Sequence, residues 1–435
     1  MVVRIITYVT VFFVVLFGFF GESLEAAENP GYFVDKEKLP FDAPNGIATD
    51  RYWGVHKGAG YRIEVPEEWN GELVLYAHGY RNEEVKELTV DNPENLRKYL
   101  LEKGYAWGAS SYSTNGYDVK QGVADTHALG KYFNGKIAKP KRTYIVGHSM
   151  GGHITGVLIE QFRNEYDGAM PMCGVMGDNE LFDFFADFNL ASQVLAGMDP
   201  VFPAEENYQT TVVPEIKQAI GLNTGLLTSE GEMLQDLTMY LSGGERPLFD
   251  IAFSSWNNFL FTLYRSDFSY GSPGNIIDNT DSIYQLDSNK ELSVEEMYLA
   301  EKIPVIAADP QARNKNGMSK IPRISGELHQ PVLTLHTLGD LFVPFSMEQL
   351  YAERVAANRD SDLLVSRAVR AVGHCEFTPA EETEAFADLA EWVEKGIKPE
   401  GDAILDPEVV SQTDFGMKFT NPIRRYDPLF SLTKE

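Results

Sequence analysis

The residues with the clearest chemical potential surround Ser149, in a Gly-x-Ser-x-Gly pattern that runs from Gly147 to Gly151. A run of β-branched and aromatic residues, 142–146, precedes the pattern, and apolar residues with helical spacing, 150–162, follow it. In this context the serine lies at a tight turn between a strand and a helix, whose N-terminus directs free N–H groups at the reacting centre. The pattern therefore predicts a nucleophilic serine.

A nucleophilic serine needs a general base, and the base needs an acid that orients it. Asp340 follows one strand-like run and His374 follows the next, 34 positions later, which leaves room for one helix and one strand. The order Ser149, Asp340, His374 matches one known chain order of nucleophile, acid and base. We predict these three residues as the catalytic set, with Asp309, at the end of another strand-like run, as the alternative acid.

Acyl transfer passes through an oxyanion that needs two hydrogen-bond donors. The backbone N–H of Met150, directly after the serine, is the expected first donor. The second is expected from the turn after the strand-like run 73–77, where the N–H of Tyr80 is preferred and that of Gly79 is the alternative. The predicted oxyanion hole is therefore formed by Tyr80 and Met150.

The elements that position these residues alternate along two parts of the chain. Such alternation is typical of an α/β protein, with a mostly parallel sheet covered by helices on both faces. The expected strands are 61–65, 73–77, 105–110, 142–146, 168–175, 331–338 and 363–372, and the expected helices are 95–103, 119–133, 150–162 and 379–395.

These motifs together resemble the α/β-hydrolase superfamily, and among its members the secreted bacterial serine esterases with a large lid. The resemblance covers roughly residues 60–178 and 326–397. It implies a mostly parallel eight-stranded sheet with helices on both faces. It also implies hydrolysis of a carboxylic ester through an acyl-enzyme, with no cofactor. No metal site is predicted, since two cysteines are too few for a structural zinc site.

The alternation is interrupted between residues 179 and 325, where the sequence is aromatic and rich in Gly, Asn and Ser. In proteins that this chain resembles, an insertion at this point forms a lid over the active site. The organisation we expect is a signal peptide at 1–27, the first part of the core at 28–178, a lid insertion at 179–325, the second part of the core at 326–397 and an extended C-terminal tail at 398–435.

The first residues have the pattern of an export signal, because Arg4 precedes a mostly apolar run, 5–20, and a polar stretch with small residues follows. Sixteen residues are short for a membrane span, which needs about 20. We therefore expect a secreted or periplasmic protein, with an uncleaved membrane anchor as the alternative. The net charge of −27 excludes a nucleic-acid partner and disfavours an anionic membrane surface.

Two cysteines are present, Cys173 and Cys375, and both are expected at the rim of the sheet where the active site forms. An oxidising destination permits a disulfide between them, and two buried free thiols are the alternative. The His374-Cys375 pair is also similar to the tannase and feruloyl esterase family, in which a disulfide joins cysteines that flank the catalytic serine and histidine. This chain differs because His148, and not a cysteine, precedes Ser149.

The expected lid suggests what kind of substrate binds. It has 9 basic against 21 acidic residues, so a neutral or cationic substrate is favoured over an anionic one. Asn115, Tyr117 and Trp256 are predicted substrate contacts. Ten aromatic residues could line a pocket or form the core of the lid: Phe182, Phe184, Phe185, Phe188, Phe253, Trp256, Phe259, Phe261, Tyr264 and Tyr270.

The sequence therefore predicts a serine esterase that acts on a small-molecule or polymeric ester, partly aromatic or apolar in character. A peptidase or amidase with the same triad is the first alternative. A non-catalytic binding module descended from a hydrolase is the second, and the complete triad argues against it.

Overall fold

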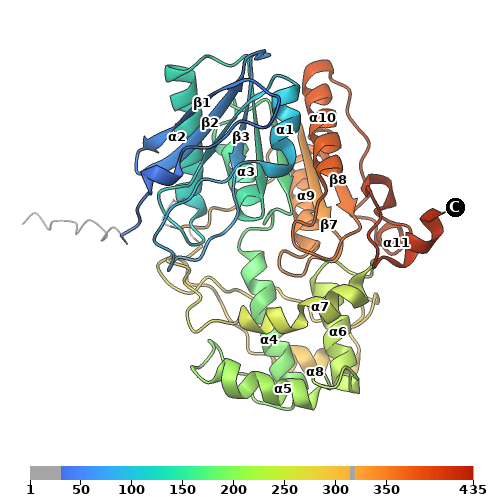
Figure 1. Cartoon of the computed structure of the whole chain (residues 1–435). Coiled ribbons are helices and arrows are strands. Elements are labelled where there is room, and N and C mark those ends of the chain that lie inside the picture. Colours follow the sequence, from blue (N-terminus) through green and yellow to red (C-terminus); the bar gives the residue numbers. More distant parts are fainter. Residues whose placement is uncertain (1–30, 314–318, 435) are drawn as a thin grey trace, which may run out of the picture. The chain divides into compact units, whose positions relative to one another are not determined.

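Eight strands form one sheet in the order β1-β2-β4-β3-β5-β6-β7-β8 (Figure 1). The first strand pairs antiparallel with the second, the second antiparallel with the fourth, and all other neighbours are parallel. The strands are β1 (Thr49–His56), β2 (Ala59–Pro66), β3 (Glu72–Ala77), β4 (Ala106–Ser110), β5 (Arg142–His148), β6 (Gly168–Met172), β7 (Val332–Thr337) and β8 (Leu364–Val369). The predicted mostly parallel, eight-stranded sheet is confirmed.

This architecture comes from a computed structural model that describes residues 31–313 and 319–434. The signal peptide expected at 1–27 lies outside the described residues. Within the described ranges, no helix is long and apolar enough to cross a membrane.

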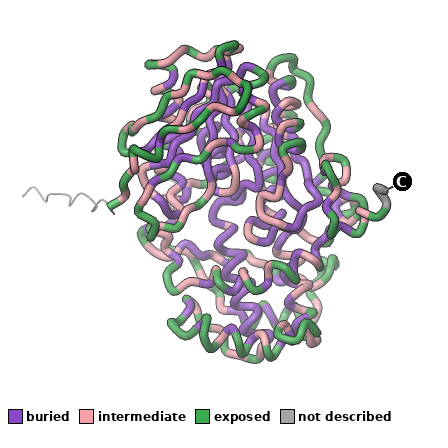
Figure 2. The backbone as a smooth tube through the Cα atoms, in the orientation of Figure 1, coloured by how far each residue is buried: buried purple, intermediate pink, exposed green. Residues whose placement is uncertain are grey.

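Helices cover both faces of the sheet. Residues of α2, α3 and α9 share one buried apolar cluster with the strands, and residues of α1 and α10 share another. Strands β3, β4, β6 and β7 are buried along their whole length, as expected for a parallel sheet covered on both sides. Figure 2 shows buried backbone in the interior of the chain and exposed backbone mostly at its periphery. The helices are α1 (Glu94–Glu102), α2 (Val119–Lys136), α3 (Met150–Gln161), α9 (Ser346–Asn358) and α10 (Pro379–Lys395).

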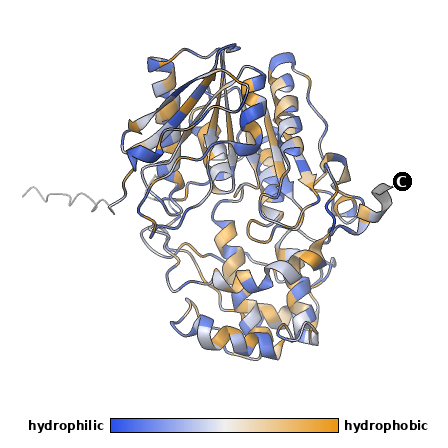
Figure 3. Cartoon of the chain, in the orientation of Figure 1, coloured by the Kyte–Doolittle hydropathy of each residue, from blue (hydrophilic) through white to orange (hydrophobic). Residues whose placement is uncertain are grey.

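The segment 179–325, expected as a lid, occupies the connection between β6 and β7 and is largely helical. Its first helix, α4, is buried from Leu181 to Leu195 and carries many of the apolar residues of this segment (Figure 3). The cluster around α4 also contains Leu341, Val343 and Val372, so it is continuous with the loops that carry Asp340 and His374. The helices are α4 (Glu180–Leu195), α5 (Val213–Ala219), α6 (Ser229–Leu241), α7 (Phe249–Thr262) and α8 (Val294–Lys302), with a π-helical turn, η2 (Tyr208–Val212).

The C-terminal tail differs from the expected extended segment because it contains α11 (Pro407–Val410) and two 3₁₀ turns, η4 (Met417–Phe419) and η5 (Pro428–Lys434). A buried ion pair holds it to the sheet: Arg370 donates from Nε to Asp427 at 2.7 Å and from Nη2 at 2.9 Å. Such a bidentate pair fixes position as well as charge. The tail therefore braces the chain between β8 and His374.

The connection from β5 to α3 generates the first prediction. A Cβ atom added at Gly151 would lie 2.0 Å from the carbonyl oxygen of Ala77, a backbone atom that cannot move aside. Gly151→Ala should therefore lower the free energy of unfolding by about 3 kcal/mol or more, measured by chemical denaturation. Gly135→Ala is the matched control, because it lies in α2 with no atom near the added Cβ, and it should raise stability by about 0.5–1 kcal/mol. Equal stability of the two variants would contradict the tight packing.

Candidate active site

Ser149 lies between the end of β5 and the start of α3, with a φ of +59° and a ψ of −122°. A positive φ is unusual for a residue with a side chain and marks local backbone strain at functional turns. The turn is possible because two glycines surround it. A Cβ at Gly147 would lie 2.3 Å from the carbonyl oxygen of Gly151, so α3 begins in direct contact with β5.

The structure brings Ser149, Asp340 and His374 together, although 225 positions separate the serine from the histidine. His374 Nε2 lies 2.9 Å from Ser149 Oγ, and His374 Nδ1 lies 2.5 Å from Asp340 Oδ2. Because a carboxylate only accepts, Nδ1 carries the proton and Nε2 is left to accept the serine proton. This arrangement can activate the serine as a nucleophile.

Asp340 is fully buried and is fixed by the turn that follows it. Its Oδ1 accepts hydrogen bonds from the N–H groups of Phe342 and Val343, at 2.9 and 3.0 Å. These bonds leave Oδ2 facing the imidazole of His374. The ring of Phe342 then packs edge-on against His374, with centroids 5.0 Å apart, which limits the orientations open to the base.

A buried pair of side chains, His336 and Glu348, also supports the turn that follows Asp340. His336, in β7, donates from Nε2 to the carbonyl of Val343 at 2.8 Å. Its Nδ1 lies 3.4 Å from Oε1 of Glu348 in α9. Burial opposes protonation of His336, but the Glu348 carboxylate outweighs it and the pKa of the imidazole is raised. His336, which belongs to no motif in the sequence, therefore helps to hold Val343, whose N–H binds Asp340.

A disulfide joins Cys173 to Cys375, with Cα atoms 5.3 Å apart, so the bridged alternative is the one that the structure contains. Cys173 directly follows β6, whose last residue, Met172, accepts a hydrogen bond from the N–H of Ser149 at 3.0 Å. The bond therefore ties the loop of His374 to the strand beside the serine. The residue before Ser149 is His148, so the cysteine that pairs with Cys375 does not flank the serine. It follows β6, the strand next to β5 in the sheet.

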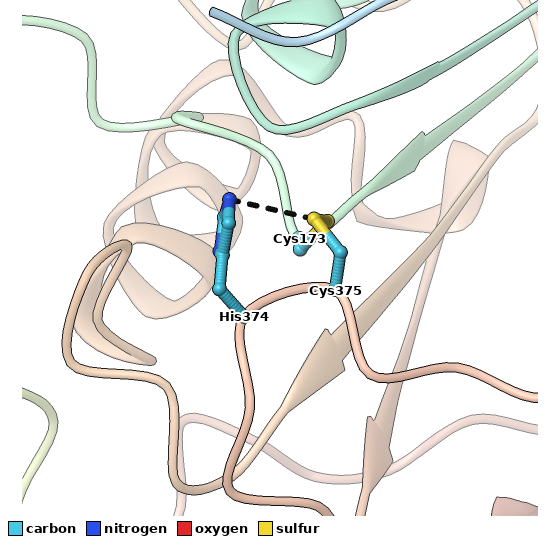
Figure 4. Close-up of side chains that lie close together, drawn as sticks. All are labelled: Cys173, His374 and Cys375. Atoms are coloured by element: carbon cyan, nitrogen blue, oxygen red, sulfur yellow. Dashed lines mark hydrogen bonds between the residues drawn. A yellow bond between two sulfur atoms is a disulfide. The ribbon is translucent and has the colours of Figure 1, made fainter. Parts of the chain in front are cut away.

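Figure 4 shows His374 beside this disulfide, with Nε2 3.4 Å from Sγ of Cys375. Two sulfurs and a ring nitrogen this close resemble a ligand set for a soft metal ion. A cysteine binds such a metal through its thiolate, however, and these two sulfurs are bonded to each other. With the disulfide intact, the two cysteines hold the loop of His374 in place and offer no thiolate ligand.

The turn predicted to supply the second oxyanion donor lies against the serine. A Cβ at Gly79 would be 3.3 Å from Cβ of Ser149, a tight contact, so the glycine lets this backbone lie close to the serine without displacing it. Burial lowers the pKa of His78 to about 4, and its neutral ring donates from Nδ1 to the carbonyl of Gly79 at 2.7 Å. This bond orients the peptide that carries the N–H of Tyr80. Met150, the first residue of α3, has an N–H without a partner inside its helix.

Ser149 opens into a cavity of about 260 Å³. Its walls are mostly apolar and aromatic, and they come from the loops after β3, β4 and β6, from the segment 179–325 and from the turn after Asp340. Tyr117, a predicted substrate contact, is part of the wall, and its hydroxyl is held by Nδ1 of His153 at 3.1 Å. The lining residues are Tyr80, Tyr117, Ser149, Val175, Leu181, Phe182, Phe185, Thr262, Leu263, Arg265, Tyr270, Phe342 and Val343.

Two other predicted substrate contacts do not line this cavity. Asn115 donates from Nδ2 to the carbonyl of Val85 at 2.7 Å and thereby supports a loop. Trp256 donates from Nε1 to the carbonyl of Val372 at 2.8 Å, so it binds the backbone near the base and not the substrate space. In the structure both side chains bind backbone carbonyls outside the lining of this cavity, and their contact with a substrate stays a prediction.

Other candidates are also placed away from the site. Asp309, the alternative acid, accepts from the N–H of Asn275 at 2.8 Å within the lid segment. Of the ten aromatic residues considered, only Phe182, Phe185 and Tyr270 line the cavity. Six of the others lie in or against the apolar core of the segment 179–325, where aromatic pairs such as Phe188 and Phe261 pack 5.1 Å apart. The remaining one, Phe259, packs edge-on against Phe342, with ring centroids 5.0 Å apart.

The sheet carries a serine turn after β5, an acid after β7 and a histidine after β8, in that order along the chain. The chain has the α/β-hydrolase fold. The predicted fold class is thereby confirmed, and the turn at Ser149 lies at the C-terminal end of a central parallel strand, where ligands bind in open α/β sheets.

Comparison with known proteins gives distant similarities only. No family model matches the sequence. The chain is 22% identical over 412 residues to the o-phthalyl amidase of Xanthobacter agilis, covering 81% of this chain and 88% of that protein. Among solved structures it is similar to feruloyl esterase B from Aspergillus oryzae (TM-score 0.49, 13% identity, 85% of this chain and 86% of that one). It is also similar to an esterase from Aspergillus oryzae (TM-score 0.45, 15% identity, 81% of each chain).

The disulfide generates the second prediction. It closes a loop across 202 positions, so its loss should cost about 5 kcal/mol of stability through the entropy of the unfolded chain. Cys173→Ala, Cys375→Ala and the double variant should all lose the same amount in denaturant unfolding, since each removes the same bond.

A reducing agent should lower the stability of the wild type to that of the variants and leave the variants unchanged. Two titratable thiols in the unfolded, unreduced wild type would contradict the bridge.

Proposed function

We propose that this protein is a serine hydrolase that cleaves carboxylic esters through an acyl-enzyme. The observation that carries the proposal is the hydrogen-bonded chain from Asp340 through His374 to Ser149, which ends in an apolar cavity. A buried acid, a histidine in a fixed tautomer and a serine at a strained turn are the parts that nucleophilic acyl transfer needs.

In the proposed reaction His374 Nε2 takes the proton of Ser149 as Oγ attacks the substrate carbonyl. The oxyanion of the tetrahedral intermediate accepts hydrogen bonds from the N–H groups of Met150 and Tyr80. His374 then protonates the leaving alcohol, and the acyl group stays on the serine. Water, deprotonated by the same histidine, hydrolyses the acyl-enzyme and restores the free hydroxyl.

Amide hydrolysis is the second candidate. The relative from Xanthobacter agilis is named an o-phthalyl amidase, and its similarity extends over 81% of this chain. The same triad would protonate a leaving amine in place of an alcohol. We therefore propose a substrate with an aromatic or apolar acyl group and include the aryl amides in the assay below.

We further propose that the protein is exported. The apolar run 5–20 after Arg4 has the order of a secretory signal. The disulfide supports this destination, because such bonds persist in oxidising compartments and are rare in the cytosol. N-terminal sequencing of the protein recovered from its native cells tests the proposal: a mature chain that begins near residue 28 supports export, and an intact Met1 contradicts cleavage.

The third prediction concerns the nucleophile. Ser149→Ala should lose at least about 10³-fold in kcat, because the triad works as a unit. The assay is a panel of p-nitrophenyl esters, aryl esters and the matching anilides, with folding checked by circular dichroism. Ser255→Ala, an exposed serine in α7, should retain full activity. An active Ser149→Ala variant would overturn the proposed mechanism.

The fourth prediction concerns pH. For a neutral ester, kcat/KM should decline as the pH is lowered, because a protonated His374 cannot accept the proton of Ser149. His374→Gln should remove the activity and with it this acid limb, whereas His329→Gln, at an exposed position, should leave the profile unchanged. A profile that stays flat between about pH 5 and 8 would contradict histidine as the base.

A further inference from the structure

The cavity beside Ser149 has one charged residue among its described lining residues, Arg265. The rest of the wall consists of apolar side chains, tyrosines, one threonine and the serine itself. A cation in an apolar wall is costly unless it has anionic partners, and an arginine fork matches the geometry of a carboxylate.

The surroundings of Arg265 fix its position but leave donors free. Its Nη2 donates to Oε1 of Glu83 at 3.1 Å, and its guanidinium carbon lies 4.9 Å from the centre of the Tyr270 ring. Its backbone carbonyl accepts from the N–H of Ala204 at 3.0 Å. A guanidinium has five N–H donors in a planar fork, so the contacts with Glu83 and Tyr270 orient the group without saturating it.

The geometry also shows at which end of the cavity Arg265 lies. Its side chain is 39% exposed, whereas Phe182 and Leu181 in the same wall are almost fully buried. Arg265 therefore stands on the open side, and the aromatic side chains form the closed side. At about 260 Å³ the cavity suits a small ring-bearing acyl group better than a long chain.

We propose that Arg265 anchors a second carboxylate on the substrate, so that the preferred acyl group is an aromatic ring bearing a free carboxylate. This inference rests on the proposed serine hydrolase and names its substrate class. It replaces the neutral or cationic substrate expected from the net charge of the lid, because a count of charges does not reveal that a single arginine faces the cavity.

The test compares two 4-nitrophenyl esters that release the same leaving group. One acyl group is 3-carboxybenzoyl and the other is its neutral methyl ester, 3-(methoxycarbonyl)benzoyl, and the readout is the ratio of their kcat/KM values. Wild type should favour the carboxylate, and Arg265→Gln should lower the ratio about 10- to 100-fold, as expected for loss of hydrogen bonds to a charged group, with the change mainly in KM. Arg265→Lys should recover part of it.

Two further variants separate this role from a purely structural one. Arg323→Gln removes the same charge from an exposed position outside the cavity and should keep the wild-type ratio. Glu83→Gln breaks the ion pair but leaves the cation, so the preference for the carboxylate should persist or increase. If the only role of Arg265 were its ion pair with Glu83 in the loop after β3, Glu83→Gln and Arg265→Gln would change the ratio of kcat/KM values equally.

Binding of benzene-1,3-dicarboxylate to Ser149→Ala, measured by calorimetry, tests the anchor without catalysis. Affinity should fall about 10- to 100-fold when Arg265→Gln is added. An unchanged affinity, or a ratio of kcat/KM values that Arg265→Gln does not alter, would overturn the anchor while leaving the serine mechanism intact. Hydrolysis of both esters by Ser149→Ala would instead overturn the proposed function itself.

Discussion

The site depends on one constraint: the imidazole of His374 must lie between two groups that come from distant parts of the chain. Its ring is held by Asp340 on one side, faces Ser149 on the other and is packed by Phe342. Each of these contacts is supported from a different element. The turn N–H groups fix Asp340, the glycines place Ser149, and the bond from Cys375 to the end of β6 fixes the histidine loop.

The surrounding fold can be understood as support for this geometry. Buried polar groups that have no part in the chemistry bind the backbone next to residues that do. His336 binds the carbonyl of Val343, Trp256 binds that of Val372, and the ion pair of Arg370 with Asp427 braces the strand end before His374. Because the apolar core of the segment 179–325 is continuous with the same loops, this segment contributes to the position of Asp340 and His374 as well as to the cavity.

Much of the core could be predicted from sequence because its signals are local. The seven expected strands and four expected helices correspond to observed elements, with ends that differ by at most three residues. The triad residues could be proposed because each follows a recognisable strand.

β1 was not predicted, since this edge strand has no buried residue and therefore lacks a clear apolar pattern. The cavity could not be predicted either: Phe185 and Phe188 look alike in sequence, and only tertiary packing places the first at the cavity and the second in the lid core. Similarly, the cysteines allowed either a bridge or free thiols until their distance was known.

In the proposed mechanism Ser149 forms the covalent intermediate. The most direct test is to treat the folded protein with a fluorophosphonate and to locate the added mass by peptide mapping. We expect one modification per chain, on the peptide that contains Ser149, and no modification after heat denaturation. A label on another residue, or a folded protein that takes up no label, would contradict it.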